Sequence, residues 1–461
     1  MISINVIVIL FLITVLILGL KTKSESNSNS YIFVGRKLTL IPFIATLVST
    51  WYGGILEIGR YSFENGITTW IIFGVTYYFA AYIFSYYIVP KIIYKNVQTI
   101  PKYFNKNYGK VPSMVSIIII LFITSPAPYL KILADIFQYL WDIPYLTALI
   151  FSSIFSILYI FNGGFKSIVK TDKIQFILMY LGFITILITA YFKYGGLNYL
   201  LNNAPEYAFK IPGNLNWSTI FVWGMIALVT FIDPSFYQRT FAGQSVKTVQ
   251  KGIKISILCW IVFDGLTIFT GIYASAILSN PINTNPYLLL SENLLPPIFQ
   301  GLFIISLMSI IMSTIDSFSF ISAYTIGIDL SSIYKFNLFK SLNTKQKTQL
   351  GIVITSIISI VIAYHFEFVI DIWYTSGSFA VAVLLIPMLL ALNNKKLPFS
   401  SLNMISSFSA TMLWFIYGML NNNYGYPIYP LNIEPMYPGL IISIIIWITC
   451  EFIIRFISSK N

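Results

Sequence analysis

The stretch Ser49–Gly54, reading STWYGG, interrupts a long apolar run over residues 38–58. Each of the two adjacent glycines costs a helix about 1 kcal/mol relative to alanine. Broken backbone inside a bilayer is tolerated only where it is buried in protein or lines a polar cavity. Secondary transporters build ion and substrate sites from such broken helices. A kinked helix with small residues at a packing contact is the other interpretation. The stretch alone leaves both open.

Composition identifies a polytopic membrane protein. The 461 residues are 57% hydrophobic and only 10% charged, a balance that no soluble domain has. The pattern predicts thirteen membrane spans, at about 2–20, 39–61, 67–90, 113–133, 144–161, 174–192, 217–235, 255–278, 298–328, 349–366, 370–392, 401–420 and 437–457.

The distribution of lysine and arginine predicts the topology. Of the 28 basic residues, all except Arg60, Lys131, Lys193 and Lys210 fall in alternate loops or the C-terminal tail. One of these loops is 236–254, which includes Arg239. Basic loops stay on the cytoplasmic side. The N-terminus is therefore expected outside and the C-terminus inside, in the cell membrane. The net charge of +12 faces anionic lipid rather than nucleic acid.

Several function classes find no support in the sequence. The chain has no phosphate-binding GxxxxGK(S/T) loop, so ATP is not expected to drive it. Cys259 and Cys450 both fall in apolar segments, and we expect no disulfide between them. The single histidine, His365, excludes histidine metal clusters and is expected at a helix end. We expect neither an enzyme nor an obligate protein partner.

The ninth span carries a stripe of hydroxyl side chains. Its serines are spaced three, four and four residues apart, which places them on one helix face: Ser306, Ser309, Ser313 and Ser317. Thr314 lies beside the stripe, and the carbonyl of Ile310 faces the same side. A hard cation such as Na⁺ needs several oxygen ligands, which hydroxyls and the freed carbonyls of a broken helix can supply. Bonding of the hydroxyls within their own helix, or helix packing, is the alternative.

Three stretches resemble motifs of the sodium:solute symporter family. The segment NGGFKSIVKTDKIQ at 162–175 resembles a cytoplasmic signature, with Ser167 where alanine is usual. The segment DPSFYQR at 233–239 resembles the loop after the sixth core helix, and MSTIDS at 312–317 resembles the core of the eighth. The motifs occur in the family order, and the resemblance extends over nearly the whole chain.

The resemblance implies an all-α, leucine-transporter-like core made of two inverted five-helix repeats, with one extra helix before it and two after it. The expected division is an N-terminal helix and loop, a first repeat, an extracellular loop, a second repeat and two C-terminal helices: 1–37, 38–193, 194–214, 215–393 and 394–461. The broken stretch at Ser49–Gly54 would be the first core helix and the serine-striped span the eighth.

The resemblance also implies the site. Carried onto matching positions, Na⁺ would bind the carbonyls of Ser49, Tyr52 and Ile310 and the hydroxyls of Ser313 and Thr314. Asp172 would lie near the cytoplasmic sodium exit, or would pair with Lys170 or Lys173. The residues expected at the solute are Trp51, Gly53, Gly54 and Trp223.

The solute is a small organic molecule in this interpretation. Trp51, Ile55, Leu56 and Val229 stand where sugar-carrying members have their polar residues, which argues against a sugar. The run TWYGG resembles the choline-transporting branch, and Trp51 and Tyr52 could offer a cation–π face. An amino acid, a quaternary amine and an organic acid all remain possible.

Charged residues within the spans each require an explanation. Glu57 and Arg60 are expected to pair, as are Lys131 and Asp135, while Asp264 and Asp316 have no assigned role. Three alternatives to sodium-coupled import stay open: proton coupling on the same fold, a solute sensor without transport, and a membrane enzyme such as an envelope polysaccharide polymerase. The short tail and the weakly charged outer loops disfavour the last two.

Overall fold

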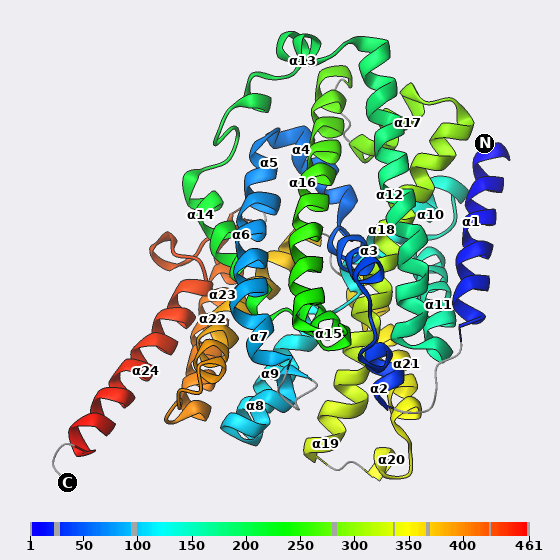
Figure 1. The fold of residues 1–461 in the computed structure, drawn as a ribbon. Helices are drawn as coiled ribbons and strands as arrows, with labels where there is room; N and C mark the ends of the chain where they lie inside the picture. The colour runs from blue at the N-terminus through cyan, green and yellow to red at the C-terminus, as the bar shows by residue number, and fades with distance from the viewer. Residues whose placement is uncertain are drawn as a thin grey trace.

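The computed structural model describes residues 2–22, 28–93, 99–278, 284–334, 337–365, 369–423 and 426–458. Within these ranges the protein is almost entirely helical, with long helices running side by side between two ends of the molecule (Figure 1). Four of the lysines used for the topology prediction lie outside the described residues: Lys23, Lys95, Lys335 and Lys460.

The first half of the described chain begins with a lone helix and ends with a 30-residue helix. Its elements are α1 (Ile2–Leu20), α2 (Ser28–Phe33), η1 (Val34–Arg36), α3 (Leu40–Trp51), α4 (Ile55–Asn65), α5 (Thr68–Trp70), η2 (Ile71–Val75), α6 (Thr76–Ile83), η3 (Phe84–Ile88), α7 (Val89–Ile92), α8 (Ile100–Tyr108), α9 (Lys110–Ile123), α10 (Ala127–Trp141), α11 (Tyr145–Gly163) and α12 (Phe165–Tyr194).

The second half repeats the pattern of long helices joined by short ones. Its elements are α13 (Leu197–Asn203), η4 (Glu206–Phe209), α14 (Trp217–Ile226), η5 (Ala227–Ile232), α15 (Pro234–Ala242), α16 (Val246–Ile277), α17 (Pro286–Leu294), α18 (Pro297–Tyr324), η6 (Thr325–Leu330), α19 (Ser331–Tyr334), α20 (Asn337–Lys340), α21 (Thr344–His365), α22 (Val369–Leu392), α23 (Ser400–Leu420), β1 (Asn422–Asn423), β2 (Tyr426–Pro427), η7 (Pro430–Asn432) and α24 (Met436–Ser458).

Up to twelve segments of the described chain are long and apolar enough to cross a membrane. Eleven are single spans, some with a short non-helical interruption, and the twelfth is the pair α3 and α4, which bends by 60° between Trp51 and Ile55. The helix α23 has 21 residues and corresponds to the twelfth of the thirteen predicted spans, but it is not among these twelve. The polytopic all-α class is therefore confirmed, while the count of thirteen remains a prediction.

The helix α18 forms the centre of the bundle. Nearly all of its residues from Gly301 to Tyr324 are buried, the polar ones included. It packs against α12, α21, α1, α3 and α10. The hydroxyl stripe of α18 therefore faces protein on all sides rather than lipid.

Several spans of the described chain contain a break, and two of these breaks lie in corresponding halves of the chain. The first is the bent pair α3 and α4. The second is α14, which passes into the 3₁₀ segment η5 and then, after Asp233, into α15. Pro234 is the first residue of α15 and cannot donate a backbone hydrogen bond, which favours a new helix start there. Two broken helices at corresponding places agree with the predicted pair of repeats, although the repeat boundaries stay a prediction.

Figure 1 places the short basic segments together. The helices α2, α8 and α20 and the end of α24 lie at the lower end, while α13 and α17 lie at the upper end. The start of α1 lies toward the upper end, opposite the end of α24. This arrangement is the alternation that the lysine distribution requires; which end is cytoplasmic remains a prediction.

The predicted charge pairs have different outcomes. Arg60 Nη1 lies 3.9 Å from Glu57 Oε2, so that pairing is confirmed. Lys131 and Asp135 form no ion pair within 4.0 Å in the described structure, and Lys131 Nζ instead donates to the Tyr145 hydroxyl at 3.2 Å. Tyr145 begins α11, so this contact joins α10 to the next helix.

Candidate functional site

The break between α3 and α4 leaves backbone oxygens free. In the described structure no backbone N–H donates to the carbonyl oxygens of Ser49 or Tyr52. The hydrogen bonds of α4 begin beyond the break, where Glu57 and Ile58 donate to the Gly54 carbonyl. Free carbonyls at membrane depth are tolerated where they meet protein groups or an ion.

The hydroxyl side chains of α18 meet this break. Ser313 Oγ donates to Ser49 Oγ at 2.9 Å. Thr314 Oγ1 lies 2.8 Å from the Thr50 carbonyl oxygen and 3.2 Å from that of Ile310. Four of the five residues predicted to bind sodium (Ser49, Ile310, Ser313 and Thr314) therefore lie in one hydrogen-bonded cluster. Ser49 takes part through its hydroxyl rather than through the predicted carbonyl.

Gly53 brings the fifth predicted ligand beside this cluster. A Cβ atom at Gly53 would lie 2.5 Å from Thr314 Cβ, so the backbone passes directly over Thr314. Tyr52 precedes Gly53, and its side chain turns away to Phe263, with a ring-centroid distance of 4.6 Å. Only the carbonyl of Tyr52 is thus available as a ligand.

The serine stripe does not act as one unit. Ser309 bonds within its own helix to the Ile305 carbonyl at 2.6 Å. Ser306 faces α12, where a Cβ at Gly182 would collide with it. Ser313 and Ser317 alone of the four bond to residues of α3 in the described structure. The packing interpretation is therefore right for half of the stripe.

Asp172 lies in the same cluster rather than beside Lys170 or Lys173. It is fully buried on α12. Its Oδ1 accepts from Ser313 Oγ at 2.7 Å, and its Oδ2 accepts from the Thr46 hydroxyl. A carboxylate thus contacts one of the predicted sodium ligands directly.

Arg239 was expected in a cytoplasmic loop, and this expectation is wrong. The side chain is fully buried on α15. Its Nη2 donates to three hydroxyls, at 3.0, 2.7 and 2.9 Å: Thr46, Thr50 and Ser317. Thr46 therefore joins the guanidinium to Asp172. A buried charge that is paired through hydrogen bonds avoids the large cost of an isolated one, so Arg239 and Asp172 stabilise each other.

Asp316 lies on another face of α18. It is fully buried, and its Oδ2 accepts from the hydroxyl of Tyr159 on α11. This bond ties α18 to α11, and neither residue lines the solute cavity described next.

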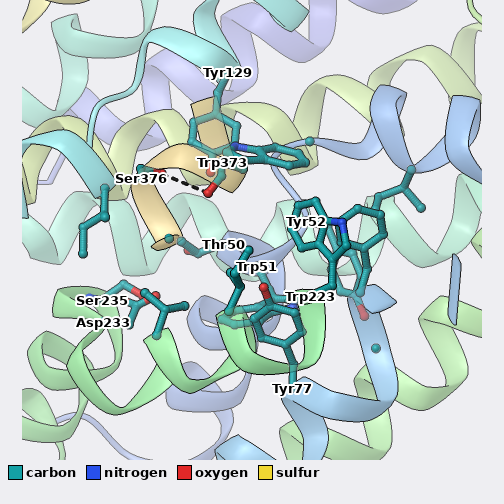
Figure 2. Close-up of a pocket in the computed structure, with 18 of the residues that line it drawn as sticks. Thr50, Trp51, Tyr52, Tyr77, Tyr129, Trp223, Asp233, Ser235, Trp373 and Ser376 are labelled. Atoms are coloured by element: carbon teal, nitrogen blue, oxygen red, sulfur yellow. Dashed lines mark hydrogen bonds between the residues drawn. The ribbon is translucent and has the colours of Figure 1, made fainter. Parts of the chain in front are cut away.

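A cavity of about 170 Å³ opens beside the break. Figure 2 shows Thr50, Trp51 and Tyr52 from the break, with Tyr77 and Trp223 near Trp51, Tyr129 and Trp373 on one side, and Asp233 and Ser235 below. One water needs roughly 10–15 Å³ by the same kind of measure, so the cavity has room for a small solute.

Of the residues predicted to contact the solute, three line the cavity and one faces the sodium cluster instead. Trp51, Gly54 and Trp223 line the cavity. Gly53 does not line it and instead faces Thr314. A Cβ on Gly54 would overlap the indole ring of Trp373 on α22. Glycine at position 54 therefore allows that tryptophan to approach the break.

Sequence reasoning did not select several cavity residues. The cavity is lined by Tyr77, Tyr129 and Trp373. In the sequence, an aromatic residue of an apolar helix that lines a cavity cannot be distinguished from one that packs against another helix. Asp264 had a signal, because a lone charge within a span indicates function by default. Its position on the cavity wall required the fold.

The comparisons with known proteins identify the family of the chain. Residues 31–399 match the profile described as the sodium:solute symporter family. The chain belongs to the sodium:solute symporter family. The family consists of transporters rather than enzymes, in agreement with the prediction from sequence.

The curated proteins with similar sequences include two proline transporters. The chain is 27% identical over 288 residues to a sodium/proline symporter of Haemophilus influenzae, a match that covers 57% of this chain and 56% of that protein. It is 25% identical over 360 residues to the high-affinity proline transporter PutP of Bacillus subtilis, covering 72% and 73%. The first match therefore spans little more than half of the relative's length.

The fold is shared with a solved structure of another transporter. A Na⁺-coupled sialic acid symporter in a substrate-bound outward-open state superposes with a TM-score of 0.72 at 16% identity, covering 96% of each chain. The predicted symporter fold is thereby confirmed.

Proposed function

We propose that this chain is a sodium-coupled symporter that imports a small organic solute across the cell membrane by alternating access. The observation that carries the proposal is the meeting of the α3–α4 break with Ser313 and Thr314 of α18. Family membership supports Na⁺ as the coupling ion.

The sodium ligands in this proposal are the carbonyls of Ser49, Tyr52 and Ile310 and the hydroxyls of Ser313 and Thr314. Hydroxyls that now bond to one another or to the break would turn their oxygens toward the ion. Because the ligands come from α3 and α18, bound Na⁺ would hold the two helices in one arrangement. A ligand shifts a conformational equilibrium only by its differential affinity for the two states.

The contact between the α3–α4 break and α18 would also couple solute binding to sodium binding. Trp51 and Gly54 belong to the break and also line the cavity, so an ion that orders the break also orders one wall of the solute site. Sodium would then raise the affinity for solute, and the solute would raise the affinity for sodium by the same factor. The cavity volume supports a small solute of the amino acid, quaternary amine or organic acid class.

Asp172 is proposed to lie on the path by which sodium leaves. Its carboxylate bonds to Ser313 and is linked through Thr46 to Arg239. An ion released from Ser313 would meet this carboxylate next. The two five-helix repeats, 38–193 and 215–393, would rock against each other to open the site to either side.

The first experiment measures sodium binding without a known solute. Purified protein is heated in NaCl and in KCl at equal ionic strength. A ligand that binds only the folded state raises stability by RT ln(1 + [L]/Kd), so the unfolding temperature should rise with Na⁺ and not with K⁺. The double variant Ser313→Ala/Thr314→Ala should lose this difference.

Ser309→Ala is the matched control, because Ser309 lies on the same helix and bonds only within it in the described structure. It should keep the sodium response. Equal stability in the two salts, or a double variant that responds to Na⁺ like the parent, contradicts the proposal. Uptake into proteoliposomes with and without a Na⁺ gradient, using labelled proline, choline and lactate, then tests transport itself.

Proton coupling is the second candidate, and the buried carboxylate of Asp172 beside Ser313 is the observation that favours it. Uptake at a fixed membrane potential, with pH and Na⁺ varied separately, distinguishes the two ions. Uptake that follows the pH gradient and ignores Na⁺ would assign the coupling to protons. Solute binding without any uptake would assign the chain to the sensors.

A further inference from the structure

Two carboxylates reach the solute cavity from different parts of the fold. Asp264 lies in the middle of α16, and Asp233 lies at the break between η5 and α15. The described residues that line the cavity include no lysine, arginine or histidine. The wall therefore carries two acidic groups and no basic one.

Asp264 is held in place by neutral donors. The Tyr78 hydroxyl donates to its Oδ2, and Trp70 Nε1 donates to Tyr78 at 2.9 Å. Gly74 lies directly beside this carboxylate, since a Cβ there would lie 2.8 Å from Asp264 Oδ2. Among the described residues no cationic side chain lies within 4.0 Å of Asp264. The carboxyl group of Asp264 is thus oriented by hydrogen bonds but has no ion-pair partner within the described residues.

Asp233 caps α15 and also faces the cavity. Its Oδ1 accepts from the backbone N–H groups of Ser235 at 2.6 Å and Phe236 at 3.4 Å. Arg239 lies about one turn and a half further along, but its recorded hydrogen bonds go to Ser235 and to the cluster that contains Asp172. Asp233 has no ion-pair partner within the described residues.

Aromatic side chains form much of the remaining wall. Trp51, Tyr77, Trp223 and Trp373 surround the space shown in Figure 2. Aromatic rings attract cations to their faces, most strongly where water is excluded. The rings and the carboxylates thus favour the same sign of charge in a ligand.

One polar group of the wall lacks a partner. Thr69 is 1% exposed and lines the cavity, and its Oγ1 has no hydrogen bond within the described structure. A buried hydroxyl without a partner is costly. A ligand that hydrogen-bonds here would remove that cost, so the site is suited to a solute with polar as well as charged atoms.

From these contacts we infer that the transported solute is a small organic cation, an amine that carries a net positive charge. This inference rests on the proposed symport function and selects one of its solute classes. The positive group would lie between the aromatic rings and the two carboxylates. An organic acid would meet uncompensated negative charge, which opposes binding. A zwitterion would place its own carboxylate in the same acidic wall.

Equilibrium binding to the purified protein tests this inference. The probes are choline and ethanolamine as cations, proline as the zwitterion and lactate as the anion, each with and without NaCl. At least one cation should bind, more tightly with Na⁺, and proline and lactate should bind at least tenfold more weakly. Asp264→Asn and Asp233→Asn, which keep the shape and the acceptor oxygen, should each weaken cation binding at least tenfold.

Asp371→Asn is the matched control, because Asp371 belongs to α22 but does not line the cavity. It should bind the cation as the parent does. The Na⁺-dependent rise in unfolding temperature identifies variants that are folded, since neither carboxylate belongs to the sodium cluster. If an asparagine variant is unfolded, the relative affinities of the parent protein for the four probes still decide whether the solute is a cation.

The possible results separate the two proposals. Na⁺-dependent binding of proline or lactate in preference to both cations overturns the cation assignment and leaves sodium coupling intact. Cation binding that survives both asparagine substitutions, or a panel in which no cation binds, also overturns the assignment. Cation binding whose affinity does not depend on Na⁺ supports the cationic solute class and contradicts the proposed sodium coupling.

Discussion

Gly53→Ala tests whether the contact between the α3–α4 break and α18 forms the sodium site. The added Cβ would lie 2.5 Å from Thr314 Cβ and 2.6 Å from Thr314 Oγ1. Ordinary contact begins near 3.4 Å, so the break and α18 must separate by about 0.9 Å. Overpacking of this kind costs roughly 1–3 kcal/mol.

The same separation should weaken sodium binding. If the strain falls on the sodium-bound arrangement, 1–3 kcal/mol corresponds to an affinity loss of about 5- to 150-fold. The assay is the unfolding temperature as a function of NaCl, with KCl keeping the ionic strength constant. The sodium concentration that gives half of the rise should increase by that factor.

Gly265→Ala is the control for the general effect of replacing glycine, which stabilises through the unfolded chain by about 0.4–1 kcal/mol. Gly265 lies in α16, and a Cβ there has no described atom within 4 Å. It should leave the sodium midpoint unchanged. A Gly53→Ala protein with the parent's sodium midpoint would refute the argument that Gly53 and Thr314 position the ion ligands.

Three further substitutions test other contacts. Arg239→Lys should lower stability by roughly 1.5–3 kcal/mol for each charged hydrogen bond lost, measured by thermal unfolding. A single ammonium cannot reproduce a guanidinium whose Nη1 donates to the Ser235 carbonyl while its Nη2 bonds to three hydroxyls. An unchanged unfolding temperature would contradict the buried network. Asp233→Ala should be about 1 kcal/mol less stable than Asp233→Asn, since asparagine still caps α15; equal stability would show that the cap is unimportant. Ser407→Ala should loosen the packing of α23 against its neighbours, because the Ser407 hydroxyl lies 2.9 and 2.8 Å from carbonyl oxygens of α22 and α24. Faster hydrogen exchange confined to α23 and α24 would verify this.

The sequence predicted the general form of the site because its signals are local. Two glycines after an aromatic pair interrupt a helix wherever the chain goes. Serines three and four residues apart share a helix face, and motif order supplied the family. The predictions for Ser49, Ser313 and Thr314 combined these local patterns with the family resemblance, and the structure places the three residues together.

The errors concern residues whose partners are distant in sequence. Arg239 follows the end of a span and resembles a loop residue, yet α15 turns it into the core, where Thr46 and Ser317 accept its hydrogen bonds. Lys131 has Asp135 one turn away, but its partner is Tyr145 on the next helix. Helical spacing reports neighbours on one helix and gives no information on the helices around it.

The sequence by itself determined the membrane class, the alternation of basic loops, the break at Ser49–Gly54 and the family, because each depends on composition or on residues close together in the chain. Only the tertiary structure decided what the break faces. It placed Gly53 against Thr314 and Gly54 against Trp373, and so assigned adjacent glycines to the ion side and the solute side. It also brought Asp233 and Asp264 to one cavity. A site whose walls come from separate helices exists only once those helices pack.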